Sequence, residues 1–286
     1  KVFGKYSAAE ITAAISAIPL RDLAAASVLT VFSYLVLCCY DLMALSYVEG
    51  RMRLRSLFFT AFTAYAFGNN IGLASVAGSS IRFRLYTGFG LKPGQILRII
   101  AFVTTTFWLG FLSIAGLAML MSPIQLPSNY AISASLSTAI GTCALLLAAL
   151  YIGFCRFART PFILKGQHLN LPRPGLALTQ ALTAAFDWAL AASVLYFLLP
   201  HGHIGFFAFL SIFVTAQVIA LITSVPGGVG VLEALVVYFM SANHEPTPAI
   251  LGGLLVYRLI YYVIPLLFAA FLFAAHEIGA KARVRA

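Results

Sequence analysis

Two short segments of the chain bring small, polar and charged residues together between long apolar stretches. In the first, residues 78–86 read Gly-Ser-Ser-Ile-Arg-Phe-Arg-Leu-Tyr. Small residues let a ligand approach the backbone, serines can hydrogen-bond an anion, and arginine and tyrosine add charge-assisted hydrogen bonds. The segment therefore predicts a phosphate-binding site made of Ser79, Ser80, Arg82, Arg84 and Tyr86. The spacing of two puts the arginines on different faces of a helix, so both reach one phosphate only if the backbone is irregular.

The second segment, residues 224–233, reads Ser-Val-Pro-Gly-Gly-Val-Gly-Val-Leu-Glu. Proline and glycine interrupt a helix, and Glu233 falls in the first turn of the helix that restarts, where the helix dipole favours a negative charge. One interpretation is a carboxylate that only caps this helix. The other is a carboxylate that faces a polar cavity and meets a cationic group.

Three further charges, Asp41, Asp187 and Arg258, stand alone within apolar stretches. Arg258 could pair with Asp187 or with Glu233, which would be a structural role. Tyrosines beside Arg258 can supply hydroxyl groups or an aromatic wall. His201 and His203 have metal-ligand spacing but no third ligand nearby, and we expect neither a metal nor a cofactor. No nucleophile and base pair or nucleotide-binding loop is present, so the sequence shows no catalytic apparatus.

The composition shows where these segments must lie. The chain has 286 residues, of which 62% are hydrophobic and 9% are charged, whereas a soluble domain has about 25% charged residues. Residues 99–155 and 188–232 contain no Asp, Glu, Lys or Arg at all. Each stretch is long enough for two crossings at roughly 20 residues per helix. The runs do not alternate as β-barrel strands do, so the sequence predicts an all-α integral membrane protein.

The formal net charge of +10 comes from 18 basic and 8 acidic residues. The basic residues cluster at the ends of apolar stretches, which is typical of cytoplasmic loops beside anionic lipid headgroups. Arg82 and Arg84 could therefore be simple headgroup anchors, as an alternative to the phosphate site. No groove-reading motif accompanies the charge, so we expect no nucleic acid as a partner. The four cysteines lie in apolar stretches and are interpreted as packing residues.

The hydrophobic pattern predicts a polytopic bundle with about six full spans and two broken segments. An interfacial helix is expected over residues 7–18. The expected spans are residues 20–47, 99–121, 130–155, 175–199 and 249–275.

The broken segments are residues 57–80, interrupted at 68–72, and residues 204–240, interrupted at 226–230. The positive-inside rule makes the first enter and leave from the cytoplasm and the second from the outside. Such opposed broken segments are typical of inverted repeats, although no sequence repeat is visible, and they indicate a substrate path near the membrane midplane. The residues expected along this path are Asn69, Asn70, Pro226, Gly227, Gly228, Arg258 and Tyr262.

Five motifs in order carry a family resemblance: residues 40–41 (Tyr-Asp), 69–72 (Asn-Asn-Ile-Gly), 78–91, 226–233 and 257–265. In this order they resemble the transmembrane region of the lysylphosphatidylglycerol synthetase and flippase family, the multiple peptide resistance factors of bacteria. The resemblance covers about residues 10–275. It implies that the chain flips aminoacylated phosphatidylglycerol to the outer leaflet and so confers resistance to cationic antimicrobial peptides.

The resemblance also implies roles for individual residues. Arg82 and Arg84 would hold the lipid phosphate, and Asp41, Asp187 and Glu233 would meet the ammonium groups of a lysyl headgroup. The expected partners are lysylphosphatidylglycerol or phosphatidylglycerol, the bilayer of the bacterial cytoplasmic membrane, an aminoacyltransferase domain and a second copy of the chain. The lysyltransferase domain of the family is absent from residues 1–286, so this segment is expected to be a transporter and not an enzyme.

We expect one transmembrane domain over residues 1–286, divided into an interfacial helix (1–19), a membrane bundle (20–275) and a basic cytoplasmic tail (276–286). Two alternatives stay open. The chain could be a membrane anchor or scaffold for a lipid-modifying enzyme, or it could flip another anionic or polyprenyl lipid.

Overall fold

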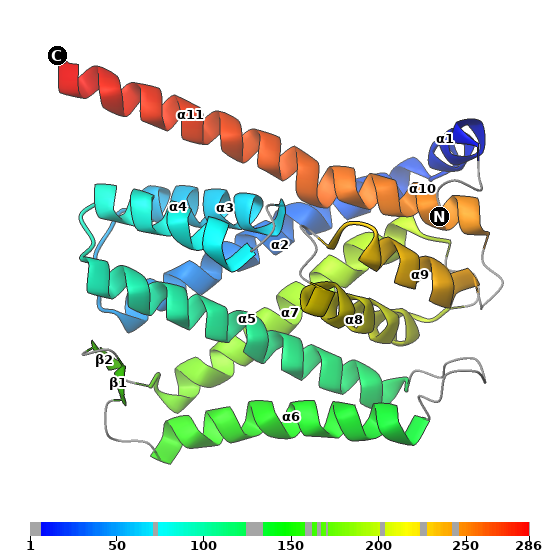
Figure 1. The fold of residues 1–286 in the computed structure, drawn as a ribbon, viewed down its shortest axis with the longest axis horizontal. Helices are drawn as coiled ribbons and strands as arrows, with labels where there is room; N and C mark the ends of the chain where they lie inside the picture. The colour runs from blue at the N-terminus through cyan, green and yellow to red at the C-terminus, as the bar shows by residue number, and fades with distance from the viewer. Residues whose placement is uncertain are drawn as a thin grey trace.

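A computed structural model of the chain describes residues 7–70, 74–123, 134–157, 162–164, 167–169, 171–200, 204–223, 228–241 and 246–285. The described part is a helical bundle (Figure 1), and five of its helices are long and apolar enough to cross a membrane. The prediction of an all-α polytopic membrane protein is confirmed. The sequence predicts about six full spans, and the described residues contain five such helices. The two broken segments form shorter helices.

The five spanning helices agree closely with the expected ranges. α2 has the predicted bounds, whereas α5 begins six residues before residue 99, because Pro93 at its first turn already fits helical geometry. The last span is continuous but contains a π-helical segment at Arg258–Val263, which we call the π segment. The spans are α2 (Leu20–Tyr47), α5 (Pro93–Met121), α6 (Ala134–Phe157), α7 (Pro174–Leu198), and α10 (Thr247–Tyr257) joined through the π segment to α11 (Ile264–Arg285).

The first broken segment forms a helical hairpin of α3 (Leu54–Asn70) and α4 (Ala74–Gly88). The two helices pack side by side, and Gly78 allows this because a Cβ there would lie 3.0 Å from the Ala64 carbonyl oxygen. The expected end of this segment near residue 80 is wrong, since α4 continues as a regular helix through the whole 78–86 motif. We call α3 and α4 the first hairpin.

The second broken segment forms the second hairpin, of α8 (Phe206–Thr223) and α9 (Val231–Ser241). Gly228 and Gly230 before α9 have positive φ angles of 62° and 85°, which favour glycine. The two hairpins enter the bundle from opposite ends, and the end of α3 and the end of α8 both lie towards its middle (Figure 1). This is the opposed arrangement that the sequence predicts.

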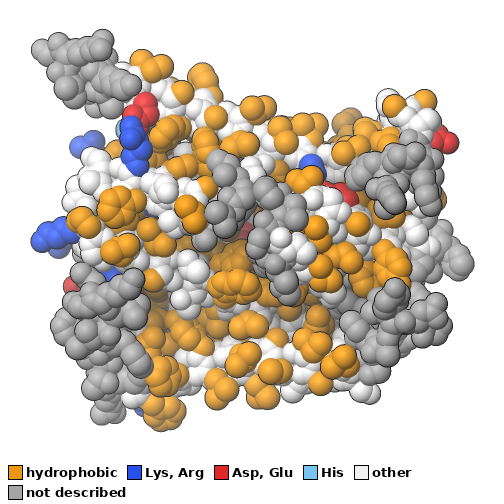
Figure 2. Space-filling model, in the orientation of Figure 1, with side chains coloured by type: hydrophobic (Ala, Val, Ile, Leu, Met, Phe, Trp, Pro, Cys, Tyr) orange, Lys and Arg blue, Asp and Glu red, His pale blue; other side chains and the backbone are white. Residues whose placement is uncertain are grey.

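α4 ends and α5 and α7 begin at one end of the bundle, at the left of Figure 1, and basic residues such as Arg84, Lys92 and Arg173 lie at these points of the chain. We call this end of the bundle the basic end. On the face drawn in Figure 2, hydrophobic side chains cover the middle of the molecule and Lys and Arg lie mainly at this edge. That distribution is the one a membrane-spanning bundle requires.

Three smaller features complete the fold. α1 (Ala8–Ser16) is closed by a capping box between Ser7 and Glu10 and packs on α10. A short hairpin of β1 (Phe162–Leu164) and β2 (Gln167–Leu169) lies in the basic loop between α6 and α7, which the all-α prediction missed. The expected tail at 276–286 is helical as far as Arg285, because α11 continues past the apolar stretch.

Two large hydrophobic clusters form most of the core of the described residues. One joins α7 to the second hairpin and α10, and the other joins α2 and the first hairpin to α5. α5 and α7 meet at Gly110, where an added Cβ would overlap the side chain and backbone of Ala184. This close crossing holds α7 in the middle of the bundle, in contact with α2, α5 and α8.

Candidate functional site

The first polar group of the bundle joins α2 to the first hairpin. Arg82 donates from Nε and Nη2 to the two carboxylate oxygens of Asp41 at 2.9 and 2.8 Å, and the Tyr86 hydroxyl donates to Asp41 Oδ1 at 2.7 Å. The Arg82 guanidinium carbon lies 4.4 Å from the ring centroid of Tyr65. Asp41 is fully buried and Arg82 is 5% exposed. The two hydrogen bonds make this a bidentate ion pair, and removal of either partner would leave an uncompensated charge in the apolar interior.

The second polar group surrounds Asp187 in the middle of α7. The Ser33 hydroxyl donates to Oδ1 at 2.6 Å, and the Tyr40 hydroxyl donates to Oδ2 at 3.2 Å. Ser33 also shares a hydrogen bond of 2.8 Å with the hydroxyl of Tyr261 in the π segment. Asp187 is 6% exposed and has no ion-pair partner in the part of the chain that the structure describes.

The third polar group joins the second hairpin to the last span. Arg258 Nε donates to Glu233 Oε1 at 2.6 Å, and the Gly230 amide donates to Glu233 Oε2 at 2.7 Å. The Arg258 guanidinium carbon lies 4.7 Å from the ring centroid of Tyr262. The sequence left Asp187 and Glu233 as possible partners of Arg258, and the structure shows that Glu233 is the partner. The carboxylate caps the start of α9 and binds a cation at the same time.

These three groups are continuous. The rings of Tyr40 and Tyr65 lie 6.0 Å apart and connect the first group to the second. The rings of Tyr261 and Tyr262 lie 5.3 Å apart and connect the second to the third. We call the whole set the polar spine; its members are Ser33, Tyr40, Asp41, Tyr65, Arg82, Tyr86, Asp187, Glu233, Arg258, Tyr261 and Tyr262.

The polar spine spans a large part of the bundle. At about 1.5 Å per helical residue, Asp41 lies roughly 9 Å from the basic end of α2 and Asp187 roughly 20 Å from the basic end of α7. Arg258 lies roughly 17 Å from the opposite end of the last span. A hydrocarbon core is about 30 Å thick, so the spine runs from the basic side through the middle of the apolar layer.

The tips of both hairpins meet the π segment. The Asn70 side chain, at the end of α3, donates to the Tyr262 carbonyl oxygen at 3.2 Å and to the Ala66 carbonyl oxygen at 2.8 Å. Glu233 makes the corresponding contact from the second hairpin. Asn69 is half-buried beside Asn70, and Gly228 precedes α9. Pro226 and Gly227, like His201 and His203, lie outside the described residues.

The structure does not bring the five predicted phosphate ligands together. α4 is regular, so Arg82 points into the bundle, whereas Arg84 is exposed and donates to Glu277 at 3.0 and 2.6 Å. Ser80 is exposed and bonds the Val76 carbonyl oxygen of its own helix. In this conformation Arg82 and Arg84 cannot hold one phosphate jointly, because a spacing of two separates them on a regular helix.

A surface groove of about 570 Å³ opens at the basic end, which we call the arginine groove. Its His276 lies against the rings of Phe59 and Phe89, with centroids 5.0 and 5.6 Å away. Neither of its arginines has an ion-pair partner among the residues that the structure describes. The groove is lined by Arg53, Arg55, Ser56, Phe59, Phe89 and His276, among others.

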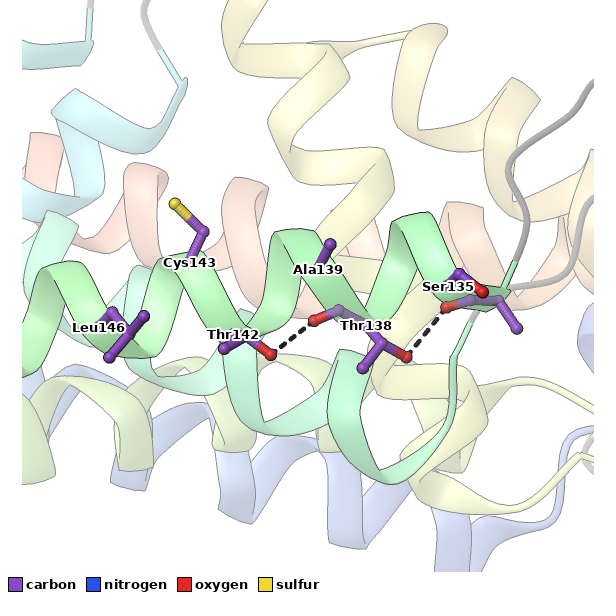
Figure 3. A pocket seen from close by; sticks show the side chains of 7 residues that line it. Ser135, Thr138, Ala139, Thr142, Cys143 and Leu146 are labelled. Atoms are coloured by element: carbon purple, nitrogen blue, oxygen red, sulfur yellow. Dashed lines mark hydrogen bonds between the residues drawn. The ribbon is translucent and has the colours of Figure 1, made fainter.

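A second groove, of about 730 Å³, runs along α6 (Figure 3). It is shallow and mostly apolar. The hydroxyls of Thr138 and Thr142 bond carbonyl oxygens of their own helix at 2.9 and 2.8 Å, so they offer little to a ligand. The groove is part of a lipid-facing helix surface and shows no built site.

Sequence reasoning missed two parts of the site. Ser33, Tyr40, Tyr65 and Tyr261 lie within ordinary apolar stretches, and only the helical spacing of Ser33, Tyr40 and Asp41 on α2 could have drawn attention to them. Arg53 and Arg55 belong to a basic cluster that was interpreted only as a mark of a cytoplasmic loop. The groove also needs His276 of α11 to pack against the first hairpin, and no local sequence pattern predicts that contact.

No family model matches the chain, but comparison with known proteins gives relatives that cover most of it. The uncharacterized protein slr0712 of Synechocystis is 34% identical over 282 residues, which are 98% of this chain and 87% of that protein. The inner membrane protein YbhN of Escherichia coli is 33% identical over 255 residues, 88% of this chain and 79% of that protein.

A phosphatidylglycerol lysyltransferase of Staphylococcus aureus is 33% identical over 104 residues, which are 36% of this chain and 12% of that protein. This similarity is partial and does not by itself place the chain among lysyltransferases. The similarity to an inner membrane protein and the five helices that are long and apolar enough to cross a membrane together describe a multi-pass membrane protein. The chain belongs to the family of slr0712 and the inner membrane protein YbhN.

Proposed function

We propose that this protein translocates a phospholipid headgroup across the bacterial cytoplasmic membrane, and that its substrate is an aminoacylated phosphatidylglycerol such as lysylphosphatidylglycerol. One observation carries the proposal: the polar spine joins two opposed hairpins through the middle of the bundle. Buried charge in an apolar layer costs on the order of 3 kcal/mol per group on insertion scales. A polar line of this length is therefore expected where a polar ligand must cross.

The partial similarity to a phosphatidylglycerol lysyltransferase supports the choice of lipid. A lysyl headgroup carries one phosphate and two ammonium groups, so it needs both cationic and anionic contacts. The molecule has both, in the arginine groove and in the three buried carboxylates. An unmodified phosphatidylglycerol would use only the cationic contacts.

The headgroup is first held at the basic end. Arg53 and Arg55 bind its phosphate in the arginine groove, and Phe59 and Phe89 contact the glycerol and the upper acyl chain. Arg84 stands nearby on α4 and can exchange Glu277 for the phosphate, because an exposed ion pair contributes little stability. The acyl tails stay in the bilayer throughout.

Inside the bundle the charge pairs serve as exchange partners. Arg82 releases Asp41 to take the phosphate, and Asp41, Asp187 and Glu233 meet the ammonium groups in turn. The buried hydroxyl of Tyr65 has no hydrogen-bond partner among the described residues. Such a group costs about 1–3 kcal/mol, which suits a place that a polar headgroup occupies during transport.

Movement of the two hairpins against the π segment would expose the spine to one side and then the other. π segments in helices frequently mark functional sites, and this one receives a contact from each hairpin tip. By this account residues 20–275 form the transport unit, with residues 1–19 at the interface and residues 276–286 on the cytoplasmic side.

A translocation assay tests the proposal. The protein is reconstituted in vesicles that contain lysylphosphatidylglycerol, and exposure of the lipid amines to a membrane-impermeant reagent is followed beside protein-free vesicles. We expect the wild type to accelerate exposure and Glu233→Gln and Arg82→Ala, where they insert normally, to lose most of the acceleration. Arg173→Ala, in the loop before α7, is the matched control and should keep the wild-type rate.

A scaffold for a lipid-modifying enzyme is the competing function. A scaffold needs no buried charge, so it should leave exposure at the protein-free rate in both the wild type and the variants. Wild-type vesicles that match empty vesicles, with and without an imposed membrane potential, would contradict translocation and favour the scaffold.

A further inference from the structure

The three buried carboxylates of the polar spine are not equivalent. Asp41 is bound by Arg82 and Glu233 by Arg258, each at 2.9 Å or less. Asp187 accepts hydrogen bonds only from the hydroxyls of Ser33 and Tyr40 among the described residues. Within the described residues it is thus the buried carboxyl group whose negative charge no side-chain cation balances.

Among the described residues, no cation pairs with Asp187. Of the elements packed against α7, α8 and the part of α5 after Arg98 have no titratable side chain, α10 has only Tyr257, and the one cation of α6 is Arg156 in its last turn. The titratable groups that face Asp187 are the hydroxyls of Tyr34, Tyr40, Tyr65 and Tyr261, which come from α2, α3 and the π segment. Neutral hydroxyls stabilise a carboxylate less than a guanidinium does, and they accept a hydrogen bond from a protonated carboxyl group equally well.

We propose that Asp187 exchanges a proton for the cationic headgroup, so that outward movement of one lysyl lipid is coupled to inward movement of one proton. The inference rests on the proposed function and adds its energy source. In the empty protein the carboxyl group holds the proton. When an ammonium group arrives, the proton leaves the carboxyl oxygen and the carboxylate pairs with the ammonium, so the charge at the site does not change.

The hydrogen-bonded groups around Asp187 supply a route for the proton. The Ser33 hydroxyl is hydrogen-bonded both to Asp187 and to the hydroxyl of Tyr261. The route leads to the π segment, where both hairpin tips converge. A movement of the hairpins against the π segment therefore reaches Asp187 through the side chains of Tyr261 and Ser33.

The stoichiometry fits the charge of the substrate. A lysyl lipid has two ammonium groups and one phosphate, so it carries a net charge of +1, and exchange for one proton moves no net charge. One unit of pH difference across the membrane then shifts the equilibrium ratio of the lipid between leaflets about tenfold.

Calorimetric titration of the purified protein with lysylphosphatidylglycerol in mixed micelles tests the exchange. Runs in buffers with different ionisation enthalpies give the number of protons released per lipid bound. We expect about one for the wild type and about zero for Asp187→Asn, whose amide oxygen accepts a hydrogen bond from one of the two hydroxyls of Ser33 and Tyr40 and whose NH2 group donates to the other. Unmodified phosphatidylglycerol, which has no ammonium group, should release none from either protein.

The outcomes separate the two proposals. Binding of lysylphosphatidylglycerol without proton release would overturn the exchange and leave the proposed function standing. No binding at all would contradict the proposed function, and the exchange with it. In vesicles with the membrane potential clamped, an acidic exterior should favour outward movement by the wild type about tenfold per pH unit and leave Asp187→Asn unaffected; equal responses would also overturn the exchange.

Discussion

At the scale of single residues, the arrangement of charge explains why the bundle tolerates five carboxyl and guanidinium groups away from water. Two guanidinium groups neutralise two carboxylates, and tyrosine rings and hydroxyls surround them. Two of these rings also lie under a guanidinium, Tyr65 under Arg82 and Tyr262 under Arg258. Such a contact contributes about 2 kcal/mol when it is shielded from water.

The pair of Asp41 and Arg82 gives the first prediction. Arg82→Gln leaves Asp41 buried without its cation and should lower the free energy of unfolding by roughly 3–5 kcal/mol. The double variant Asp41→Asn and Arg82→Gln removes both charges and should recover most of the loss. Unfolding of the detergent-solubilised protein, followed by the exposure of buried cysteines to a thiol-reactive dye, measures both.

The exposed pair of Arg84 and Glu277 is the matched control. Arg84→Gln removes an arginine from the same helix but leaves no buried charge, so its unfolding should match that of the wild type. A single variant at Arg82 as stable as Arg84→Gln, or a double variant no better than Arg82→Gln, would show that Asp41 and Arg82 do not depend on each other.

The candidate site could be predicted from the sequence only in part. A charge inside an apolar stretch is conspicuous, so Asp41, Asp187, Glu233 and Arg258 were all identified. The partners of these charged residues could not be predicted, because they depend on which faces of the helices pack together. The structure does not bring Arg82 and Arg84 together, because a joint phosphate site required an irregular backbone and α4 is a regular helix.

At the scale of elements, the close crossing of α5 and α7 sets the position of Asp187. Gly110 lies against Ala184, one helical turn from Asp187 on α7. Helices that approach this closely pack through small residues, as is common in membranes. A larger side chain at Gly110 must push the two helices apart.

We therefore predict that Gly110→Ala destabilises the bundle by roughly 1–3 kcal/mol, the usual cost of overpacking. Gly153→Ala in α6 is the matched control, because an added Cβ there meets nothing within 4 Å. It should leave stability unchanged or raise it slightly. Thermal unfolding midpoints of the two variants beside the wild type decide the matter, and equal midpoints would refute the close crossing.

Most elements were predictable because the hydrophobic stretches are long and clearly ended by Pro, Gly or basic clusters. The bounds of α2 agree with the sequence to the residue. The π segment and the β hairpin were missed. A π segment depends on how a continuous helix packs against its neighbours. The residues between the expected spans 130–155 and 175–199 show no alternating pattern that indicates strands.

At the scale of the whole molecule, the opposed hairpins predict an accessibility pattern. Gly88 ends the first hairpin at the basic end, and Gly205 precedes the second hairpin at the other end. Neither position crowds an added side chain. In a background with the native cysteines replaced, Gly205→Cys should react with an impermeant maleimide in intact cells, and Gly88→Cys only after the inner membrane is opened.

Labelling of both cysteines from the same side would contradict the opposed arrangement. The parity of the spans led to this arrangement from sequence alone, because a basic cluster on each side of residues 57–80 required both ends to lie on one side. Length and charge thus determine the topology, whereas the contacts along the polar spine depend on side-chain packing.

The central claim is that the headgroup crosses between the two hairpins along the polar spine. The most direct measurement joins the tip of the first hairpin to the π segment with a short, reducible cross-linker between cysteines placed at Asn70 and Tyr262, and follows lysylphosphatidylglycerol exposure in vesicles. The uncross-linked double variant gives the reference rate. We predict that cross-linking stops translocation and that a reductant restores the reference rate. Cross-linked protein that translocates lipid as fast as the uncross-linked double variant would contradict the account.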